Sequence, residues 1–410
     1  MNEPLSTDPY KGVRDFYPAD WARMEAMFAR IRETLALWGY EEYNASPLER
    51  AELYEAKTSE EIVHEQTYTF TDRGDRRVTL RPEMTPTLAR MLAGKRRELV
   101  FPLRWFSIGN RFRYERPQKG RLREFYQADI DVVGLPTGEA DIEIVRLASE
   151  ILKSFGAAEK DFIIRVNSRT LLNSACKAAG LTDEATRTYI RLLDKKSKMR
   201  PEEFTVASEA ISKRDPLSLV DRKDIEAFVA ALLKRGVGNV VFDAGITRGF
   251  DYYTGMVFEV FDTNPTNPRS LFGGGRYDRL IELWGGNPIP AVGFALGDVT
   301  LADFLEAHEL LPKLNFGKSQ LYLGTPSPSD IPVAQSFADT LRKEGGRIFV
   351  NLTNRTLGDQ IKDAVKRGIP LFAAYGADEV ANQNLRMKIL ATGEKVNLSI
   401  SELSARIRAN

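Results

Sequence analysis

Between residues 103 and 134, charged side chains alternate with aromatic and aliphatic ones around the run FRYERPQKGRLREFYQ. The pattern predicts two strands, residues 103–115 and 121–134, joined by a polar loop at 116–120 that contains Pro and Gly. Side chains alternate faces along a strand, so the odd-numbered residues of both strands are expected on one face. That face combines arginines with acids, an amide and a ring: Arg111, Arg113, Glu115, Arg121, Arg123, Phe125, Gln127, Asp129 and Asp131.

This face carries the groups that a nucleotide requires. An arginine can clamp a phosphate with two hydrogen bonds, Glu115 can accept from an amino group, and Phe125 can stack on a base. A charged, solvated hairpin is the alternative interpretation, but it does not explain the regular alternation with apolar residues. The basic loop also fits contact with nucleic-acid phosphate.

Three other segments contain residue types that could line a site. LRPEMTP, residues 80–86, places Glu83 where a predicted strand gives way to a helix, with Thr85 as its expected N-cap. Read alone, Glu83 is equally well a structural carboxylate paired with a neighbouring arginine. GITRGFDYYTGMVFEVFD, residues 245–262, reads as a half-buried strand with two adjacent tyrosines. FGGGRYDRLI, residues 272–281, has three glycines that permit close approach of the backbone to a ligand.

The composition limits the class of protein. A chain of 410 residues predicts two or three domains, and a net charge of +1 means that any nucleic acid is held by local patches. One Cys and two His exclude a disulfide framework and a Cys- or His-based metal site, so no metal-ligating residues are predicted. The sequence has no signal peptide and no stretch that could span a membrane, so a cytoplasmic protein is expected.

Apolar periodicity and turn residues predict the remaining elements. We expect a helix capped by Asp20 that ends near Trp38, a strand ending before Pro47, and a helix that starts after Asp298. The other predicted elements are strands at 40–46, 68–72, 78–80, 162–166, 239–243 and 290–296, helices at 138–155 and within 168–237, and alternating strands and helices from 319 onward.

The hairpin closely resembles motif 2 of class II aminoacyl-tRNA synthetases, in the wording of the histidyl-tRNA synthetase family. RGFDYYTG and FGGGRYDRLI resemble the two histidine-recognition signatures of that family, in the same order. The helix and strand that end at Pro47 resemble motif 1, which builds the class II dimer interface, and PAVGFAL at 290–296 resembles motif 3. The resemblance covers nearly the whole chain.

The resemblance implies a fold of the α/β (α+β) class. It comprises an antiparallel-sheet catalytic domain of the class II synthetases with a helical insertion, and a small C-terminal α/β anticodon-binding domain. The implied boundaries are catalytic domain 1–167, helical insertion 168–237, catalytic domain 238–312 and anticodon-binding domain 319–410.

The resemblance also implies an activity. L-Histidine would react with ATP, accompanied by Mg²⁺, to give histidyl-adenylate, and the histidyl group would pass to tRNA(His). The implied assembly is a homodimer without a membrane partner. One alternative is a non-catalytic histidine-sensing regulatory subunit of histidine biosynthesis, and another is a class II synthetase for proline or threonine. The intact ERPQKGR loop and the C-terminal domain argue against the first, and the two signatures against the second.

Each site residue receives a role through the matched motifs. Arg113 and Arg248 are assigned to the α-phosphate as the catalytic pair, Arg121 to the outer phosphates, and Glu115 and Phe125 to the adenine. Histidine is assigned Glu83, Thr85 and Gln127 for its backbone groups, and Asp131, Tyr252 and Tyr253 for its imidazole. The loop residues Arg116 and Gln118 are assigned to the tRNA acceptor end, where tRNA(His) carries an extra 5′ guanosine.

Two positions depart from the family pattern. Thr300 stands where motif 3 usually has an arginine that helps to hold ATP. Asp131 stands where the family usually has a glutamate. The first departure favours the regulatory alternative, because it removes a cation from the predicted nucleotide site.

Overall fold

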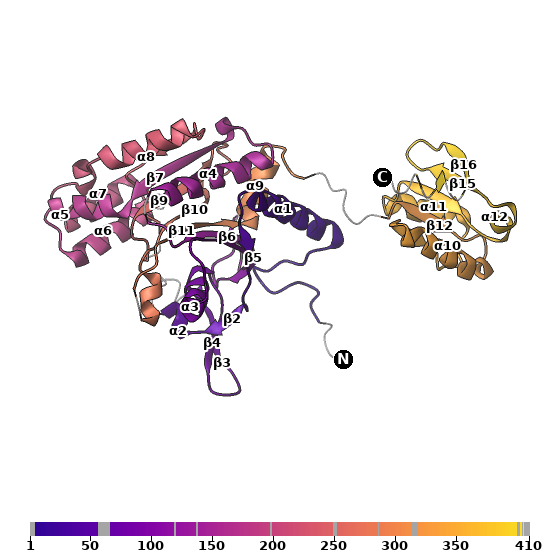
Figure 1. The fold of residues 1–410 in the computed structure, drawn as a ribbon, viewed down its shortest axis with the longest axis horizontal. Coiled ribbons are helices and arrows are strands. Elements are labelled where there is room, and N and C mark those ends of the chain that lie inside the picture. Colours follow the sequence, from indigo (N-terminus) through magenta and orange to yellow (C-terminus); the bar gives the residue numbers. More distant parts are fainter. Residues whose placement is uncertain are drawn as a thin grey trace. The chain divides into compact units, whose positions relative to one another are not determined.

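The chain forms two compact units, Met1–Pro312 and Lys313–Asn410 (Figure 1). The computed structural model describes residues 5–55, 66–118, 120–136, 138–196, 199–248, 252–285, 287–312, 319–399, 402–403 and 405. Among these residues, no helix is long and apolar enough to cross a membrane.

An antiparallel-rich sheet organises the first unit. Within the described residues it has eight strands in the order β1-β5-β6-β11-β10-β9-β7-β8. The outermost pairs, β1 with β5 and β7 with β8, are parallel, and the pairs between them are antiparallel. The strands are β1 (Glu41–Glu42), β5 (Leu103–Phe112), β6 (Glu124–Val133), β7 (Phe162–Ser168), β8 (Val240–Phe242), β9 (Met256–Asp262), β10 (Ser270–Arg276) and β11 (Ala291–Gly297). The expected α/β (α+β) class, with an antiparallel-rich sheet, is confirmed.

Helices cover one face of this sheet (Figure 1). They are α1 (Pro18–Leu37), α4 (Glu139–Ser154), α8 (Lys223–Lys234) and α9 (Asp298–Ala307), and they share one apolar core with the strands. In α4, Ile144, Leu147 and Ile151 are fully buried, as the helical spacing of apolar residues requires. Each such side chain stabilises the fold by about 1.5–3 kcal/mol.

The alternation of β6 decides which face of the sheet carries the core. Ala128, Ile130 and Val132 are 0% exposed and lie in the apolar cluster with the helices. The odd-numbered residues Gln127, Asp129 and Asp131 therefore point to the opposite face. One face of the sheet is therefore polar, while the helices pack against the other face.

Smaller elements flank the polar face. A three-stranded sheet, ordered β2-β4-β3, precedes the helix α3. The elements are β2 (Leu48–Arg50), α2 (Glu52–Glu55), β3 (Tyr68–Thr71), β4 (Arg77–Leu80) and α3 (Thr85–Lys95). Leu88 and Leu92 of α3 pack with Leu280 and Ile281 in a second apolar cluster.

The predicted helical segment divides between two cores. Helices α5 (Arg169–Ala178) and α6 (Asp183–Lys195) pack around Leu172, Cys176, Tyr189 and Leu193, with partly buried Phe204 of α7 (Pro201–Ile211) against them. Helix α8 instead contributes Ile225 and Leu232 to the core of the main sheet.

Several predicted element ends are wrong. Helix α1 begins at Pro18 rather than after Asp20, because proline at the first helical position already has the required φ. Thr85 and Asp298 are the first residues of α3 and α9 rather than their caps; Met84 and Gly297 occupy the cap positions. The strand predicted at 40–46 is only Glu41–Glu42 long, since it pairs with β5 over two residues.

The second unit is a small α/β domain. Within the described residues its sheet has the order β13-β12-β14-β15-β16, with the first three strands parallel and the last two antiparallel. Its elements are β12 (Leu321–Gly324), α10 (Ile331–Lys343), β13 (Ile348–Val350), α11 (Leu357–Lys366), β14 (Leu371–Ala374), α12 (Ala377–Asn382), β15 (Asn384–Ile389) and β16 (Lys395–Ser399). It has its own apolar core, which includes Leu323, Phe337 and Met387.

Candidate active site

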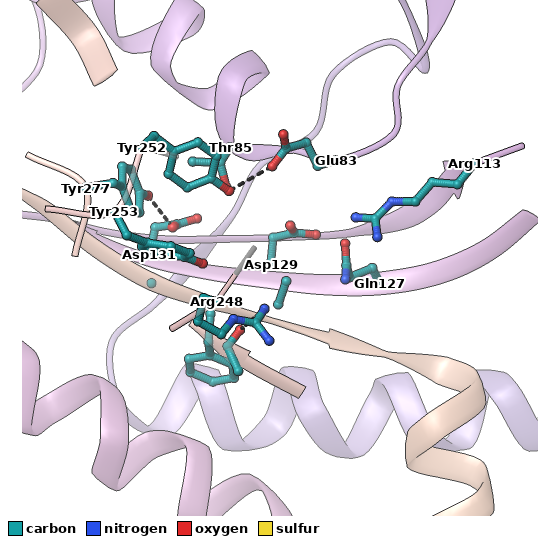
Figure 2. Close-up of a pocket in the computed structure, with 14 residues that line it drawn as sticks. Glu83, Thr85, Arg113, Gln127, Asp129, Asp131, Arg248, Tyr252, Tyr253 and Tyr277 are labelled. Carbon is teal, nitrogen blue, oxygen red and sulfur yellow. Dashed lines mark hydrogen bonds between the residues drawn. The ribbon is translucent and has the colours of Figure 1, made fainter. Parts of the chain in front are cut away.

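A pocket lies on the polar face of the large sheet (Figure 2). Its walls come from β6, β10 and β11, from the segment before α3, and from the segment before β9. Eight residues assigned from the sequence line it: Glu83, Thr85, Arg113, Gln127, Asp131, Arg248, Tyr252 and Tyr253. Their roles toward substrates remain predictions.

The β5–β6 register brings the odd-numbered residues together as expected. Arg111 lies opposite Phe125, and Ser107 lies opposite Asp129. The predicted strand ends at 115 and 121 are wrong, because the ladder stops at the pair Phe112–Glu124. The charged residues beyond that pair therefore belong to the loop region, where tertiary contacts rather than the pleat orient them.

Asp129 lies at the floor of the pocket and was not assigned to the site from the sequence. Its Oδ2 accepts from Nη2 of Arg111 at 2.6 Å, and the two side chains are 5% and 0% exposed. Burial raises the pKa of Asp129, although Arg111, Arg81 and Arg113 lower it. The only sequence signal for Asp129 was its place on the odd-numbered face.

A carboxyl and three tyrosines form one end of the pocket (Figure 2). Asp131 accepts a short hydrogen bond from the hydroxyl of Tyr277. Tyr252 donates to Oε2 of Glu83 at 2.8 Å, and its ring centroid lies 5.0 Å from Tyr253 and 5.9 Å from Tyr277. This end can surround a small polar ring with aromatic edges and hydrogen-bonding oxygens.

Burial strongly shapes the acidity of this end. It raises the pKa of Asp131 to about 8, with the nearby Asp129 charge adding to the effect and Tyr277 opposing it. Burial also raises the pKa of Tyr252 and Tyr277, and the acids Glu83 and Asp131 reinforce this. Tyr277 was not assigned from the sequence, although it lies inside the GGGRYD signature.

Two arginines provide the cationic part of the pocket. Nη1 of Arg248 lies 2.9 Å from Oε1 of Glu259, and its Nη2 donates to the carbonyl of Gly273 at 3.3 Å. Burial lowers the pKa of Arg248, but Glu259 and Tyr253 raise it above the ordinary value. Arg248 therefore remains a cation in the pocket. Nε of Arg113 donates to the carbonyl of Pro82 at 2.9 Å.

Three residues predicted for the nucleotide lie beside Arg113 rather than in the pocket wall. The guanidinium of Arg113 is 5.4 Å from the ring centroid of Phe125 and 4.0 Å from the carboxylate of Glu115. Glu115 also pairs with Nη1 of Arg121 at 3.0 Å. These contacts place an aromatic ring, an acid and two arginines side by side at the end of the pocket opposite the tyrosines.

The loop between the two long strands, residues 116–120, is termed the motif 2 loop below. Arg116 and Gln118 are exposed, and Oε1 of Gln118 accepts from Nη2 of Arg269 at 3.0 Å. This partner was not foreseen. Lys119 of the loop and residues 249–251 of the RGFDYYTG segment lie outside the described part of the chain.

Thr300 does not reach the pocket. Its hydroxyl donates to the carbonyl of Leu271 at 2.7 Å, so the side chain is turned to the backbone of β10. The neighbouring Asp298 is buried and accepts from Arg14 at 2.6 Å and from the backbone N–H of Tyr126 at 2.9 Å. This corner of the sheet is thus held by the N-terminal segment as well as by motif 3.

Comparison with known protein families shows to which family the chain belongs. A family model described as histidyl-tRNA synthetase matches residues 12–215 and 199–300, and one described as an anticodon binding domain matches residues 322–410. The chain is 39% identical to the histidine–tRNA ligase of Leptospira biflexa, over 99% of this chain and 98% of the relative. The chain belongs to the histidyl-tRNA synthetase family.

Solved structures agree with this family in fold. A histidyl-tRNA synthetase from Nostoc is 24% identical, covers 98% of this chain and 99% of its own, and superposes with a TM-score of 0.77. A protein from Bacillus halodurans, described as an ATP phosphoribosyltransferase regulatory subunit/histidyl-tRNA synthetase, covers 87% of this chain with a TM-score of 0.68. Because both types share the fold, the fold alone does not separate a synthetase from a regulatory relative.

Proposed function

We infer that this protein is a histidine–tRNA ligase, which activates L-histidine with ATP and transfers the histidyl group to tRNA(His). The observation that carries this inference is full-length similarity to a histidine–tRNA ligase, including an anticodon-binding domain. The pocket supports it, because one cavity joins an acid and tyrosines at one end to Arg113 at the other, with Arg248 also in its wall (Figure 2). The regulatory alternative is not favoured, since the match extends over 99% of the chain.

Histidine would lie at the tyrosine end of the pocket. Glu83 accepts from the α-ammonium, with Thr85 and Gln127 beside the backbone groups of the substrate. Asp131, Tyr252 and Tyr253 face the imidazole, and the Tyr252 hydroxyl also holds Glu83 through the 2.8 Å hydrogen bond. A site built from such paired oxygens rejects amino acids that lack two ring nitrogens, because its buried polar groups would be left unpaired.

Adenylation then requires positioning and charge stabilisation. An oxygen of the histidine carboxylate attacks the α-phosphorus of ATP, the bond to the β-phosphate oxygen breaks, and pyrophosphate leaves. Arg113 and Arg248 stabilise the charge that develops on the α-phosphate oxygens. No nucleophilic side chain takes part, and the rate enhancement comes from holding the two substrates in line.

The nucleotide would occupy the end of the pocket beside Arg113. Phe125 stacks on the adenine, Glu115 accepts from its amino group, and Arg121 contacts the outer phosphates. Among the described residues, no group of three or more His, Cys, Asp or Glu is placed to hold a metal ion. This fits a Mg²⁺ that arrives with ATP, because such an ion keeps phosphate and water ligands and takes only one or two carboxylates. Glu259, which lies beside Arg248, would hold it, and it would neutralise part of the triphosphate charge.

The second step uses surfaces outside the pocket. The 3′-terminal ribose of tRNA(His) takes the histidyl group from the adenylate and releases AMP. Arg116 and Gln118 approach the acceptor end, and the second unit binds the anticodon. We also propose a cytoplasmic homodimer that pairs through the motif 1 region, where α1 carries an exposed Trp21 and Leu37 and β1 forms an edge of the sheet.

ATP–pyrophosphate exchange across single amino acids tests the proposed function. We expect exchange with histidine alone. Exchange with proline or threonine would assign the chain to another class II synthetase, and absence of exchange with every amino acid, together with histidine binding, would support the regulatory alternative. Size-exclusion chromatography with light scattering checks the proposed dimer.

A further inference from the structure

Arg269 lies at the nucleotide end of the sheet, directly before β10, and the mechanism above does not use it. Its Nη2 donates to the neutral amide oxygen of Gln118 in the motif 2 loop at 3.0 Å. Arg269 is exposed, and among the residues that the structure describes no carboxylate lies within 4.0 Å of its guanidinium. A neutral amide does not offset the positive charge of a guanidinium, so this arginine can pair with an anion.

Thr300 lies close to the start of β10, which follows Arg269. The Thr300 hydroxyl bonds to the carbonyl of Leu271, two residues after Arg269, at 2.7 Å. A side-chain carbon built on Gly120 of the motif 2 loop would lie 3.9 Å from the Thr300 methyl group. Arg269, Thr300 and the motif 2 loop therefore lie together beside the nucleotide end, outside the pocket wall, and Thr300 brings no charge there.

The other arginines near the nucleotide already have acidic partners. Arg121 pairs with Glu115 at 3.0 Å, and Arg248 pairs with Glu259 at 2.9 Å. The pocket wall also carries three carboxyl groups, those of Glu83, Asp129 and Asp131. A triphosphate brings several negative charges to this acidic site, so a cation without a carboxylate partner would add to Arg121 at the outer phosphates. Arg269 is such a cation.

We propose that Arg269 binds the outer phosphates of ATP and supplies, in this chain, the charge that the family pattern places at position 300. The proposal deepens the proposed function and rests on it. When ATP enters, the guanidinium exchanges the amide of Gln118 for charge-assisted hydrogen bonds to phosphate oxygens, which are shorter and stronger. Arg269 thereby binds ATP and orients the pyrophosphate leaving group.

ATP–pyrophosphate exchange with histidine and without tRNA tests this role. We expect Arg269→Ala to raise the KM for ATP by about ten-fold, the usual effect of losing one hydrogen bond to a charged group, and to leave the KM for histidine unchanged. Arg269→Lys should have a KM for ATP between those of the wild type and Arg269→Ala, since lysine keeps the charge but lacks the planar guanidinium. Arg235→Ala is the matched control, because Arg235 is an arginine of the same unit that pairs with Glu139 at 2.7 Å.

A second substitution makes the test specific. Thr300→Arg introduced into Arg269→Ala should restore the KM for ATP, because position 300 lies beside the same nucleotide end. A wild-type KM for ATP in Arg269→Ala would overturn the proposal. If that variant also charged tRNA less efficiently while its KM for ATP stayed at the wild-type value, Arg269 would be assigned to tRNA phosphate instead. If neither the wild type nor Arg235→Ala catalyses exchange, the proposed function is refuted, and the role of Arg269 is refuted with it.

Discussion

Arg248 and Glu259 form a part-buried ion pair at the pocket, with Nη1 and Oε1 2.9 Å apart and both side chains 18% exposed. Arg248 has a φ of 58°, a conformation that residues with a side chain rarely adopt. Such backbone strain persists only where surrounding contacts hold it. Glu259 and the carbonyl of Gly273 supply those contacts, so Glu259 positions the cation predicted to face the α-phosphate.

Substitutions in this pair should affect turnover more than binding. Arg248→Ala should lower the exchange rate by about 10²–10³-fold, corresponding to roughly 2.7–4 kcal/mol of lost transition-state stabilisation. Glu259→Gln should produce a smaller fall in kcat with little change in the KM for histidine, because Arg248 stays but is less firmly held. Glu282→Gln, which changes a partly exposed acid paired with Arg279 at 3.0 Å, serves as the control. Near-normal turnover in Arg248→Ala would remove that residue from the mechanism.

Asp131 should make stability depend on pH. Burial raises its pKa from 3.8 to about 8, so the folded protein keeps this proton over a range in which the unfolded chain has lost it. The resulting stabilisation is complete below pH 3.8 and is lost as the pH rises through about 8. Asp131→Asn cannot ionise, so its free energy of unfolding should fall less than that of the wild type between about pH 5 and pH 9. Urea denaturation at several pH values measures this, and equal slopes for both proteins would contradict the shift.

Gly293 should tolerate no side chain. It lies opposite Asp131 in the sheet, and a carbon built on it would overlap the Asp131 carboxylate and the carbonyl of Ile130. Gly293→Ala should therefore cost about 1–3 kcal/mol of stability through overpacking, and it should weaken histidine binding by displacing Asp131. Gly94→Ala is the control, because Gly94 lies in α3 with nothing within 4 Å of the built carbon, and alanine there should stabilise by about 0.5–1 kcal/mol. Thermal melting and histidine titration measure both effects.

Removal of the second unit should separate the two steps of the reaction. Each unit has its own apolar core, so deletion from about residue 318 should leave the first unit folded. We expect the shortened chain to keep ATP–pyrophosphate exchange and to charge tRNA(His) less efficiently, because it lacks the proposed anticodon contacts. Circular dichroism checks that it is folded. Unchanged charging by a folded truncation would refute the proposed role of the second unit.

Gln118 should read the extra 5′ guanosine of tRNA(His). Its amide both donates and accepts, whereas a loop that meets only phosphate would affect all tRNAs alike and show a strong salt dependence. Gln118→Ala should reduce the preference for tRNA that carries the guanosine over tRNA that lacks it. Arg116→Ala is the comparison, expected to weaken both forms equally because Arg116 is assigned to the 5′ phosphate. A wild-type ratio in Gln118→Ala would show that Gln118 does not read this base.

The sequence by itself determined the hairpin and its faces. Alternation along 124–133 placed Gln127 and Asp131 on one face and left Ala128 and Ile130 for the core, and the register agrees with this. Side chains alternate between the two faces of a strand every two residues, so this pattern can be recognised from neighbouring residues in the sequence. The motifs supplied the family, which the comparisons confirm. Strand and helix ends were less well predicted, because pairing partners decide where a ladder stops.

Only the tertiary structure decided which side chains meet. Tyr277 and Asp131 are 146 residues apart, and Arg269 and Gln118 are 151 apart, so no local pattern reports either contact. The ion pair between Glu259 and Arg248 is a further case. The sequence placed Glu259 on a strand, but its pairing with Arg248 depends on the left-handed backbone conformation of Arg248. Hydrogen bonds and ion pairs act over a few ångströms, and it is the packing of the sheet that brings distant segments within that range.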